Sequence, residues 1–225
     1  MPAIAARQTP SASHAAAPVA AGAIAAFDGL GTTVTVRRDQ ALFFEGDAAR
    51  YCFKLLSGTV RSCKLLADGR RHIHQFLLPG DFVGLESGDS HRSTVEAVED
   101  AILLRYPRRE LEQLIDRQPD LGRRLLGLLR GDLSAAQAQL LLLGRKSAIE
   151  RLASFLLSLA ERRGEHGRVA LPMTRNDIAD HLGLTMETVS RVFSQLKTRG
   201  VIQLMPDGEV LIRRRDELED IAEAA

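Results

Sequence analysis

Polar side chains between positions 174 and 197 have the types and the spacing that reading DNA bases requires. Arginine offers two parallel donors that match the two acceptors of guanine, glutamate can accept from the amino group of cytosine, and serine or threonine can do either. Apolar residues recur between the polar ones at helical spacing, so the polar side chains would share the outward faces of helices. The candidate DNA-binding residues of this segment are Thr174, Arg175, Thr185, Glu187, Thr188, Ser190, Arg191 and Lys197.

Two short helices joined by a glycine turn would position these side chains. Thr174 and Asp177 have the spacing of a capping box, which begins a first helix, and Gly183 ends it. A second helix is expected to begin near Thr185. The inward faces of the two helices consist of Ile178, Ala179, Leu182, Val189, Val192, Phe193 and Leu196. The pattern predicts a helix-turn-helix, and the alternative is a plain helical hairpin with a solvated polar face.

The flanking sequence predicts the rest of a C-terminal domain over residues 144–225. An amphipathic helix is expected over 147–163 and short strands over 169–171, 201–204 and 210–212. The last two strands surround Pro206-Asp-Gly208, which predicts a hairpin. A hairpin directly after a recognition helix is the wing of a winged helix-turn-helix, and Arg213 beside it is a candidate contact to DNA phosphates.

Strand patterns dominate residues 23–118, after a tail (residues 1–22) that is rich in alanine, proline and serine and is expected to be disordered. Short apolar or alternating runs are separated by turn residues such as Glu45-Gly-Asp47 and Pro79-Gly-Asp81. The runs occur at 33–37, 41–44, 52–56, 60–66, 72–78, 94–98 and 102–106. Their spacing predicts seven or eight strands in an antiparallel β-sandwich or roll.

From residue 108 the period becomes helical, with a short helix over 108–116 and a longer one from Pro119. In the longer helix, over residues 119–143, apolar residues recur alternately three and four positions apart and form a heptad seam. The seam consists of Leu126, Leu129, Leu133, Ala136, Leu140 and Leu143. Homodimerisation through this seam is the economical interpretation, and the alternative is that the stripe packs only against its own β-domain.

Composition and motifs exclude several classes of protein. The formal net charge is only +1 over 225 residues, so DNA binding would depend on a local basic cluster, and Arg191, Lys197, Arg199 and Arg213 to Arg215 form one in the sequence. No apolar run is long enough to cross a bilayer and no secretory signal pattern begins the chain, so we expect no membrane association and a cytoplasmic location. Without a P-loop, Gly-x-Ser-x-Gly or His-Glu-x-x-His motif, the chain is not expected to be an enzyme.

Two further pairs of residues could carry chemistry. Cys52 and Cys63 lie symmetrically about Ser57-Gly58, so a tight hairpin would place them opposite each other, where they could form a disulfide or serve as buried small apolar residues. His72 and His74 would share one face of a strand and could ligate a metal or haem, or simply be solvated. We expect no metal, and two cysteines are too few for an iron–sulfur cluster.

Several segments resemble the Crp/Fnr family of bacterial transcription regulators, and most of all its FixK-type branch. The resemblance covers about residues 24–215. It rests on Asp68-Gly-Arg-Arg71, Gly80-Asp-Phe-Val-Gly-Leu-Glu86, Leu141-Leu-Leu-Gly-Arg-Lys146 and, most specifically, Met186-Glu-Thr-Val-Ser-Arg191. It implies an α+β fold with an N-terminal β-roll like a cyclic-nucleotide-binding jelly roll, a long dimerisation helix and a C-terminal winged helix-turn-helix.

The same resemblance implies a function. A homodimer would bind double-stranded DNA at an FNR-type palindrome (TTGAT-N4-ATCAA-like) and contact RNA polymerase, more often as an activator. The branch suggests low-oxygen, respiratory or nitrogen-related genes. Met186 and Ser190 stand where the cyclic-AMP-receptor branch usually has arginine and glycine, which disfavours that branch's TGTGA-type half-site.

The resemblance also raises the question of an effector. In cyclic-nucleotide-binding relatives, a Gly-Glu-Leu-Gly-type loop and a later Arg-Ser pair hold the phosphate and ribose. The candidate effector residues here are Gly84, Glu86, Arg92 and Ser93, in a loop that is shortened before Arg92. We therefore expect no cofactor. The alternative is a regulator whose DNA binding is switched on by a cyclic nucleotide in the β-roll.

Overall fold

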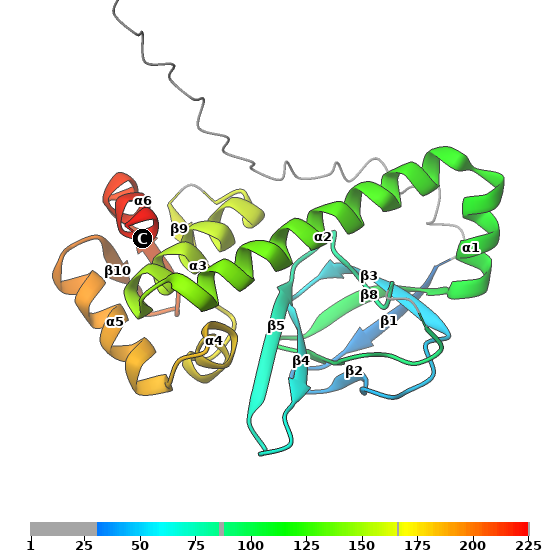
Figure 1. Ribbon diagram of the computed structural model, residues 1–225, viewed down its shortest axis with the longest axis horizontal. Coiled ribbons are helices and arrows are strands. Elements are labelled where there is room, and N and C mark those ends of the chain that lie inside the picture. The colour runs from blue at the N-terminus through cyan, green and yellow to red at the C-terminus, as the bar shows by residue number, and fades with distance from the viewer. Residues whose placement is uncertain (1–30, 86–87, 166, 225) are drawn as a thin grey trace, which may run out of the picture.

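Figure 1 shows the computed structural model of the protein, which describes residues 31–85, 88–165 and 167–224. Its N-terminal part consists of short strands followed by two helices. The strands are β1 (Thr32–Val36), β2 (Ala41–Phe43), β3 (Tyr51–Ser57), β4 (Val60–Leu65), β5 (Arg71–Leu77), β6 (Phe82–Val83), β7 (Thr94–Ala97) and β8 (Ala101–Pro107). The tail predicted over residues 1–22 lies outside the described residues.

These strands form two antiparallel sheets that pack face to face as a β-roll. One sheet has the strand order β1-β8-β3-β6 and the other β2-β7-β4-β5. Leu55 and Leu103 from the first sheet and Val60 and Val95 from the second are buried in one core cluster. The predicted β-sandwich or roll is confirmed, and every strand predicted in it lies within one residue of its expected bounds. Only β6 was missed, because two residues are too few to show a period.

The predicted hairpin that places Cys52 opposite Cys63 is wrong. β3 and β4 follow each other in the chain but enter different sheets, so Cys52 lies opposite Tyr106 of β8 and Cys63 opposite Thr94 of β7. Both are buried free thiols, and burial raises the pKa of each to about 11. Of the two interpretations, the structure supports small buried apolar residues.

Helices α1 (Arg108–Arg117) and α2 (Pro119–Arg145) follow the β-roll. Pro119 suits the first position of α2, where its missing N–H costs no helical hydrogen bond. Leu121 and Leu125 anchor the start of α2 in a cluster with Phe82 of the β-roll. From there α2 runs past the β-roll to the C-terminal part (Figure 1). The helix continues two residues beyond the predicted end at 143, because Gly144 remains helical and the chain first becomes extended at residue 146.

The C-terminal part is a helical unit with a small sheet. It contains α3 (Ala148–Arg163), β9 (Arg168–Val169), α4 (Arg175–Leu182), α5 (Met186–Thr198), β10 (Ile202–Leu204), β11 (Val210–Ile212) and α6 (Arg215–Glu223). The sheet has the order β10-β11-β9. The predictions had no helix at α6, because only Leu218 and Ala222 of its mostly charged sequence are buried.

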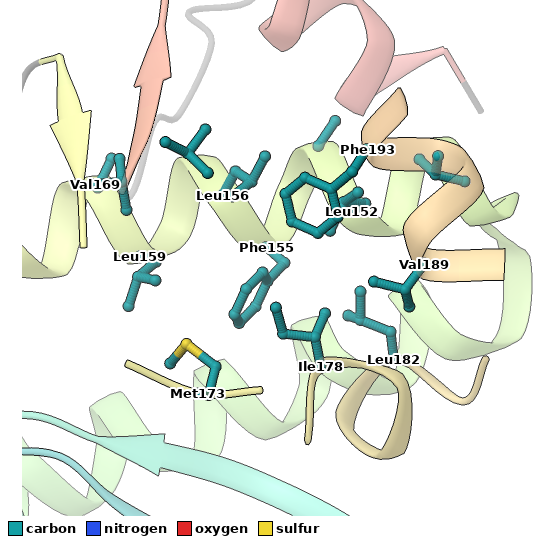
Figure 2. Close-up of a cluster of buried hydrophobic side chains, with 14 of the residues drawn as sticks. Leu152, Phe155, Leu156, Leu159, Val169, Met173, Ile178, Leu182, Val189 and Phe193 are labelled. Carbon is teal, nitrogen blue, oxygen red and sulfur yellow. The ribbon is translucent and has the colours of Figure 1, made fainter. Parts of the chain in front are cut away.

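One apolar core unites α3, α4 and α5. Figure 2 shows Leu152, Leu156, Ile178 and Phe193 converging in it. The same cluster contains Ile73 and other buried side chains of the β-roll, so the two parts of the molecule pack on each other. No helix in the described part of the chain is both long and apolar enough to cross a bilayer.

Candidate nucleic-acid interface

The first helix of the predicted helix-turn-helix begins at a capping box. The Thr174 hydroxyl accepts from the backbone N–H of Asp177 at 3.1 Å, and the Asp177 carboxylate accepts from the backbone N–H of Thr174 at 3.0 Å. At the other end, Gly183 has the left-handed conformation with φ of 62°, which glycine adopts without strain. The predicted start, the predicted turn and therefore the helix-turn-helix are confirmed.

The second helix, α5, begins at Thr185, whose hydroxyl accepts from the backbone N–H of Thr188 at 3.2 Å. All four residues predicted to face inward on α5 are buried: Val189, Val192, Phe193 and Leu196. Because one face of α5 is sealed against α3 and α4, its other face is directed to solvent. The secondary structure thus places the polar residues as the periodicity predicted.

Four predicted DNA-binding residues lie on this outer face with exposed side chains, namely Glu187, Ser190, Arg191 and Lys197. Within the described part of the chain, no ion pair engages Arg191 or Lys197. Hydrogen bonds from its own backbone N–H and from the Thr185 hydroxyl hold the pKa of Glu187 below its ordinary value. The Glu187 carboxylate is therefore ionised at neutral pH and can accept from an amino group.

Other predicted residues are partly engaged inside the protein. The hydroxyls of Thr174 and Thr185 act as helix caps, and Thr188 shares a hydrogen bond with Thr185 at 3.1 Å. The Arg175 guanidinium lies 3.3 Å from the ring centroid of Phe193, and burial lowers the pKa of Arg175. Arg175 thus packs on the core of the unit, whereas Arg191 remains available to a ligand.

Met186 was not among the predicted residues, although its side chain is exposed on the first turn of α5. An exposed apolar side chain beside Glu187 is able to contact the methyl group of thymine. The sequence signals for Met186 were its place in the motif Met186-Glu-Thr-Val-Ser-Arg191 and its position outside the inward period of α5.

The predicted wing is the hairpin of β10 and β11, which pair antiparallel. Arg213 lies directly after β11, where its Nε donates to the Gln203 side chain at 3.0 Å. The turn itself, Pro206-Asp-Gly208, carries no basic side chain. Any phosphate contact of this hairpin would therefore come from its base, at Arg213, and not from its tip.

The seam predicted on α2 is largely uncovered. Leu126, Leu129, Leu133 and Leu140 are 45 to 72% exposed, and Ala136 is exposed as well. The alternative that this stripe packs only against its own β-domain is therefore wrong. Leu143 differs, because it is half-buried near Gly183 of the helix-turn-helix turn.

Two of the candidate effector residues, Gly84 and Ser93, make hydrogen bonds with other parts of the chain. The Ser93 hydroxyl shares a hydrogen bond with Ser62 at 2.9 Å, and the Arg108 guanidinium donates to the carbonyls of Gly84 at 2.8 Å and Gly88 at 2.6 Å. Arg92 is exposed, and Glu86 lies outside the described residues.

The predicted pairing of His72 and His74 on one strand face is seen. Their ring centroids lie 5.3 Å apart on β5. Among the described residues, no three metal-ligating side chains come together.

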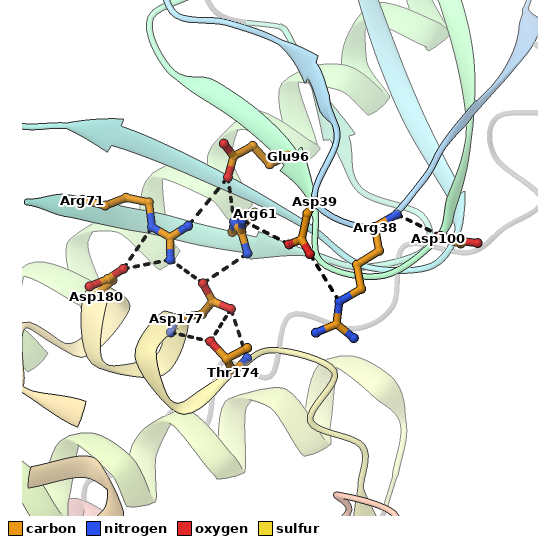
Figure 3. Close-up of polar contacts among 9 residues, drawn as sticks. All are labelled: Arg38, Asp39, Arg61, Arg71, Glu96, Asp100, Thr174, Asp177 and Asp180. Carbon is orange, nitrogen blue, oxygen red and sulfur yellow. Dashed lines mark hydrogen bonds and ion pairs between the residues drawn. The ribbon is translucent and has the colours of Figure 1, made fainter. Parts of the chain in front are cut away.

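The sequence predictions missed the polar side chains that join the helix-turn-helix to the β-roll. These are Arg61 on β4 and Arg71 on β5, which bind carboxylates of α4 (Figure 3). Arg61 had no clear signal in the sequence, because its strand at residues 60–65 also contains Ser62 and Lys64, yet Arg61 is only 8% exposed in the structure.

The fold and the exposed recognition helix together define a class of protein, the DNA-binding transcription regulators with a β-roll domain. Residues 150–221 match the profile of a Crp-like helix-turn-helix domain, and residues 33–118 match that of a cyclic nucleotide-binding domain. The chain is 44% identical to the nitrogen fixation regulation protein FixK of Azorhizobium caulinodans, over 84% of this chain and 78% of the relative. It is 36% identical to the transcriptional activator protein FnrL of Cereibacter sphaeroides, over 77% of this chain and 73% of the relative.

A solved structure agrees with these sequence relatives. FixK2 from Bradyrhizobium japonicum superposes with a TM-score of 0.83 at 43% identity, covering 87% of this chain and 98% of that one. The chain belongs to the Crp/Fnr family of transcription regulators, in its FixK-type branch.

Proposed function

We propose that the protein is a homodimeric, sequence-specific activator that reads an FNR-type palindrome, TTGAT-N4-ATCAA-like, through Glu187, Ser190 and Arg191. The observation that carries this proposal is the exposure of these side chains on a helix whose opposite face is sealed in a core. In a major groove, the arginine has the donors for guanine and the ionised glutamate an acceptor for the amino group of cytosine. The contact of the activator with RNA polymerase, and low-oxygen, respiratory or nitrogen-related target genes, are proposed from the similarity to FixK and FnrL.

The dimer is proposed on the exposed leucines of α2. A contiguous apolar stripe on a monomer surface is costly in water, and a second copy of α2 would cover it by knobs-into-holes packing. A two-fold dimer places two recognition helices about one DNA turn apart, roughly 34 Å, which suits a palindrome.

A double variant, Leu133→Glu with Leu140→Glu, tests the seam. Two carboxylates in the seam repel across the two-fold axis, so we expect a monomer by light scattering and weak binding to the palindrome. The matched control is Ser134→Glu with Ala138→Glu, which adds the same charge on exposed positions of α2 away from the seam. A dimer that persists in the first variant, or dissociates equally in both, would contradict the proposed seam.

We further propose that DNA binding needs no small molecule. The hydrogen bond between Ser93 and Ser62 supports this, because it engages a hydroxyl that a bound phosphate would need as a donor. The competing function is a cyclic-nucleotide-responsive regulator, which the match of residues 33–118 to a cyclic nucleotide-binding domain favours. A gel-shift titration with cyclic AMP and cyclic GMP separates the two. A rise in affinity of about tenfold, which is about 1.4 kcal/mol, would establish the competing function.

A further inference from the structure

The helix α4 is held at both ends by parts of the molecule outside the helix-turn-helix. At its first turn, the Asp177 carboxylate is 2% exposed and accepts from Arg61 Nη1 at 3.2 Å and from Arg71 Nη2 at 2.5 Å. One turn later, the Asp180 carboxylate accepts from Arg71 Nε at 3.0 Å. Figure 3 shows the two guanidinium groups directed from β4 and β5 toward α4.

The charges of the two arginines are balanced by the carboxylates around them. Glu96 of β7 accepts from Arg61 Nε at 2.8 Å and lies 3.7 Å from Arg71 Nη1, so carboxylates flank both guanidinium groups. The second oxygen of the Asp177 carboxylate belongs to the capping box of α4. A movement of α4 away from the β-roll would therefore break the ion pairs that Asp177 and Asp180 make with the two arginines.

At its last turn, α4 is joined to the end of α2. The Arg151 guanidinium donates to the carbonyls of Leu143, Lys146 and Leu182 at 2.8 to 2.9 Å, and the Gln139 side chain donates to the carbonyl of His181 at 3.0 Å. The side chain of Arg151 thus bridges the carbonyl end of α2 and that of α4. Helix α4 is therefore held by the β-roll at its first turn and by the end of α2 at its last turn, and these contacts together fix its position.

The recognition helix follows α4, because both share one core and are joined by the short turn at Gly183. In this arrangement Glu187, Ser190 and Arg191 remain exposed. The docked arrangement therefore leaves the reading face open and sets its direction relative to α2.

From these contacts we infer that Arg61 and Arg71 are positioning residues for DNA binding: by clamping α4 to the β-roll, they fix the spacing of the two recognition helices of a dimer. The inference rests on the proposed function, since the spacing has meaning only for a dimer on a palindrome. Neither side chain reads DNA. Both act by restricting α4 and α5 to the one orientation in which two half-sites are engaged together.

The test compares Arg71→Gln and Arg61→Gln with Arg70→Gln. Arg70 is the neighbour of Arg71, but its side chain is 78% exposed and, among the described residues, pairs only with Asp68 of the same hairpin, so its variant loses the same charge without touching α4. Each protein is titrated with the palindrome, with palindromes whose spacer is one or two base pairs longer or shorter, and with a single half-site. Urea unfolding verifies that each variant is folded. Since Arg71 is the more exposed of the two arginines, Arg71→Gln alone is sufficient if Arg61→Gln fails to fold.

We expect Arg71→Gln to bind the palindrome about tenfold more weakly or worse, to lose most of its preference for the natural spacer, and to keep the wild-type affinity for a single half-site. Arg70→Gln should match the wild type on all probes. A further variant, Asp180→Asn, removes one partner of Arg71 and should add little loss in the Arg71→Gln background, because the two residues form one interaction.

Three results would overturn the inference. Tighter binding by Arg71→Gln would mean that the clamp holds an inactive arrangement. An unchanged spacer preference would mean that the clamp does not set the spacing, and an equal loss on the single half-site would mean a merely structural role. If the wild type itself fails to prefer the palindrome over random DNA, the proposed function is wrong, and that failure is distinct from the three results above.

Discussion

The two helices of the helix-turn-helix differ in where their polar side chains find partners. On α4, Asp177 and Asp180 bind arginines of the β-roll, and the His181 ring shares a hydrogen bond with the carbonyl of Ile73 at 3.0 Å. On α5, Glu187 and Arg191 are directed to solvent. The polar groups of the first helix thus stabilise the molecule, while those of the second remain available for a ligand. Substitutions on α4 should therefore lower stability, and substitutions on α5 should lower DNA affinity.

The largest expected effect is the loss of stability that follows substitution of Asp177. Asp177→Ala removes a buried carboxylate from between two guanidinium groups and also removes the capping-box bond that the backbone N–H of Thr174 donates to it, so we expect the free energy of unfolding to fall by about 3–5 kcal/mol. The measurement is urea unfolding followed by circular dichroism. Asp120→Ala is the control, because its ion pair with Arg123 is exposed and screened by solvent, so its loss should change the free energy of unfolding very little. A loss on Asp177→Ala no larger than that of the control would mean that α4 is not held by this network.

Substitutions on α5 should have a smaller effect, which is a loss of DNA affinity without a loss of stability. Arg191→Ala and Glu187→Ala should each cost about 1–3 kcal/mol on the cognate half-site and less on random DNA, because each removes a proposed base contact. Unfolding in urea should be unchanged within about 0.5 kcal/mol, as is usual for exposed residues. Titrations against all single-base variants of TTGAT at fixed salt measure the preference. Glu187→Ala should relax it at one base pair per half-site.

The control for these variants is Thr198→Ala, which lies at the opposite end of α5 from the turns proposed to enter the groove. It should keep the wild-type base preference. If both α5 variants also keep that preference, α5 does not read the sequence and the proposed function is wrong.

The sequence could predict features that depend on neighbouring residues, but not contacts between distant parts of the chain. The capping residues of α4, the turn at Gly183 and the buried face of α5 are local signals within about four residues, and all of them were predicted. The bond from Arg61 to Asp177 joins positions 116 residues apart, and nothing in the local pattern indicates the partner. The two cysteines were misplaced for the same reason, since hairpin symmetry is a local signal and the choice of sheet is not.

Below neutral pH, His181 should make the stability of the folded protein depend on pH. Its ring packs against the rings of Phe76 and Phe155, and burial lowers the pKa of His181 to about 4 from the ordinary value of 6.5. Between these values the unfolded chain binds a proton that the folded protein refuses. The stabilisation is therefore complete above about pH 6.5 and is lost as the pH falls toward 4.

We expect His181 to account for a loss of about 2 kcal/mol in the free energy of unfolding between pH 7 and pH 5, and His181→Asn to lack this part of the pH dependence. Urea unfolding across this range measures it, and an NMR titration of the His181 ring gives the midpoint directly. A midpoint near 6.5 would show that the ring is solvated and that the last turn of α4 is not closed against the β-roll.

The smallest expected effect is on Arg213 at the base of the wing. Its side chain is exposed and, within the part of the chain that the structure describes, bonds only to Gln203 of the same hairpin, so Arg213→Gln should change stability by less than about 0.5 kcal/mol. If Arg213 contacts a phosphate, the variant should bind cognate and random DNA more weakly by the same factor, and the slope of log affinity against log salt should fall by about one unit. Arg70→Gln loses the same charge outside the wing, in the turn before β5, and should leave that slope unchanged. A selective loss on cognate DNA would instead assign base reading to the wing, and the contrast between the two helices would no longer account for recognition alone.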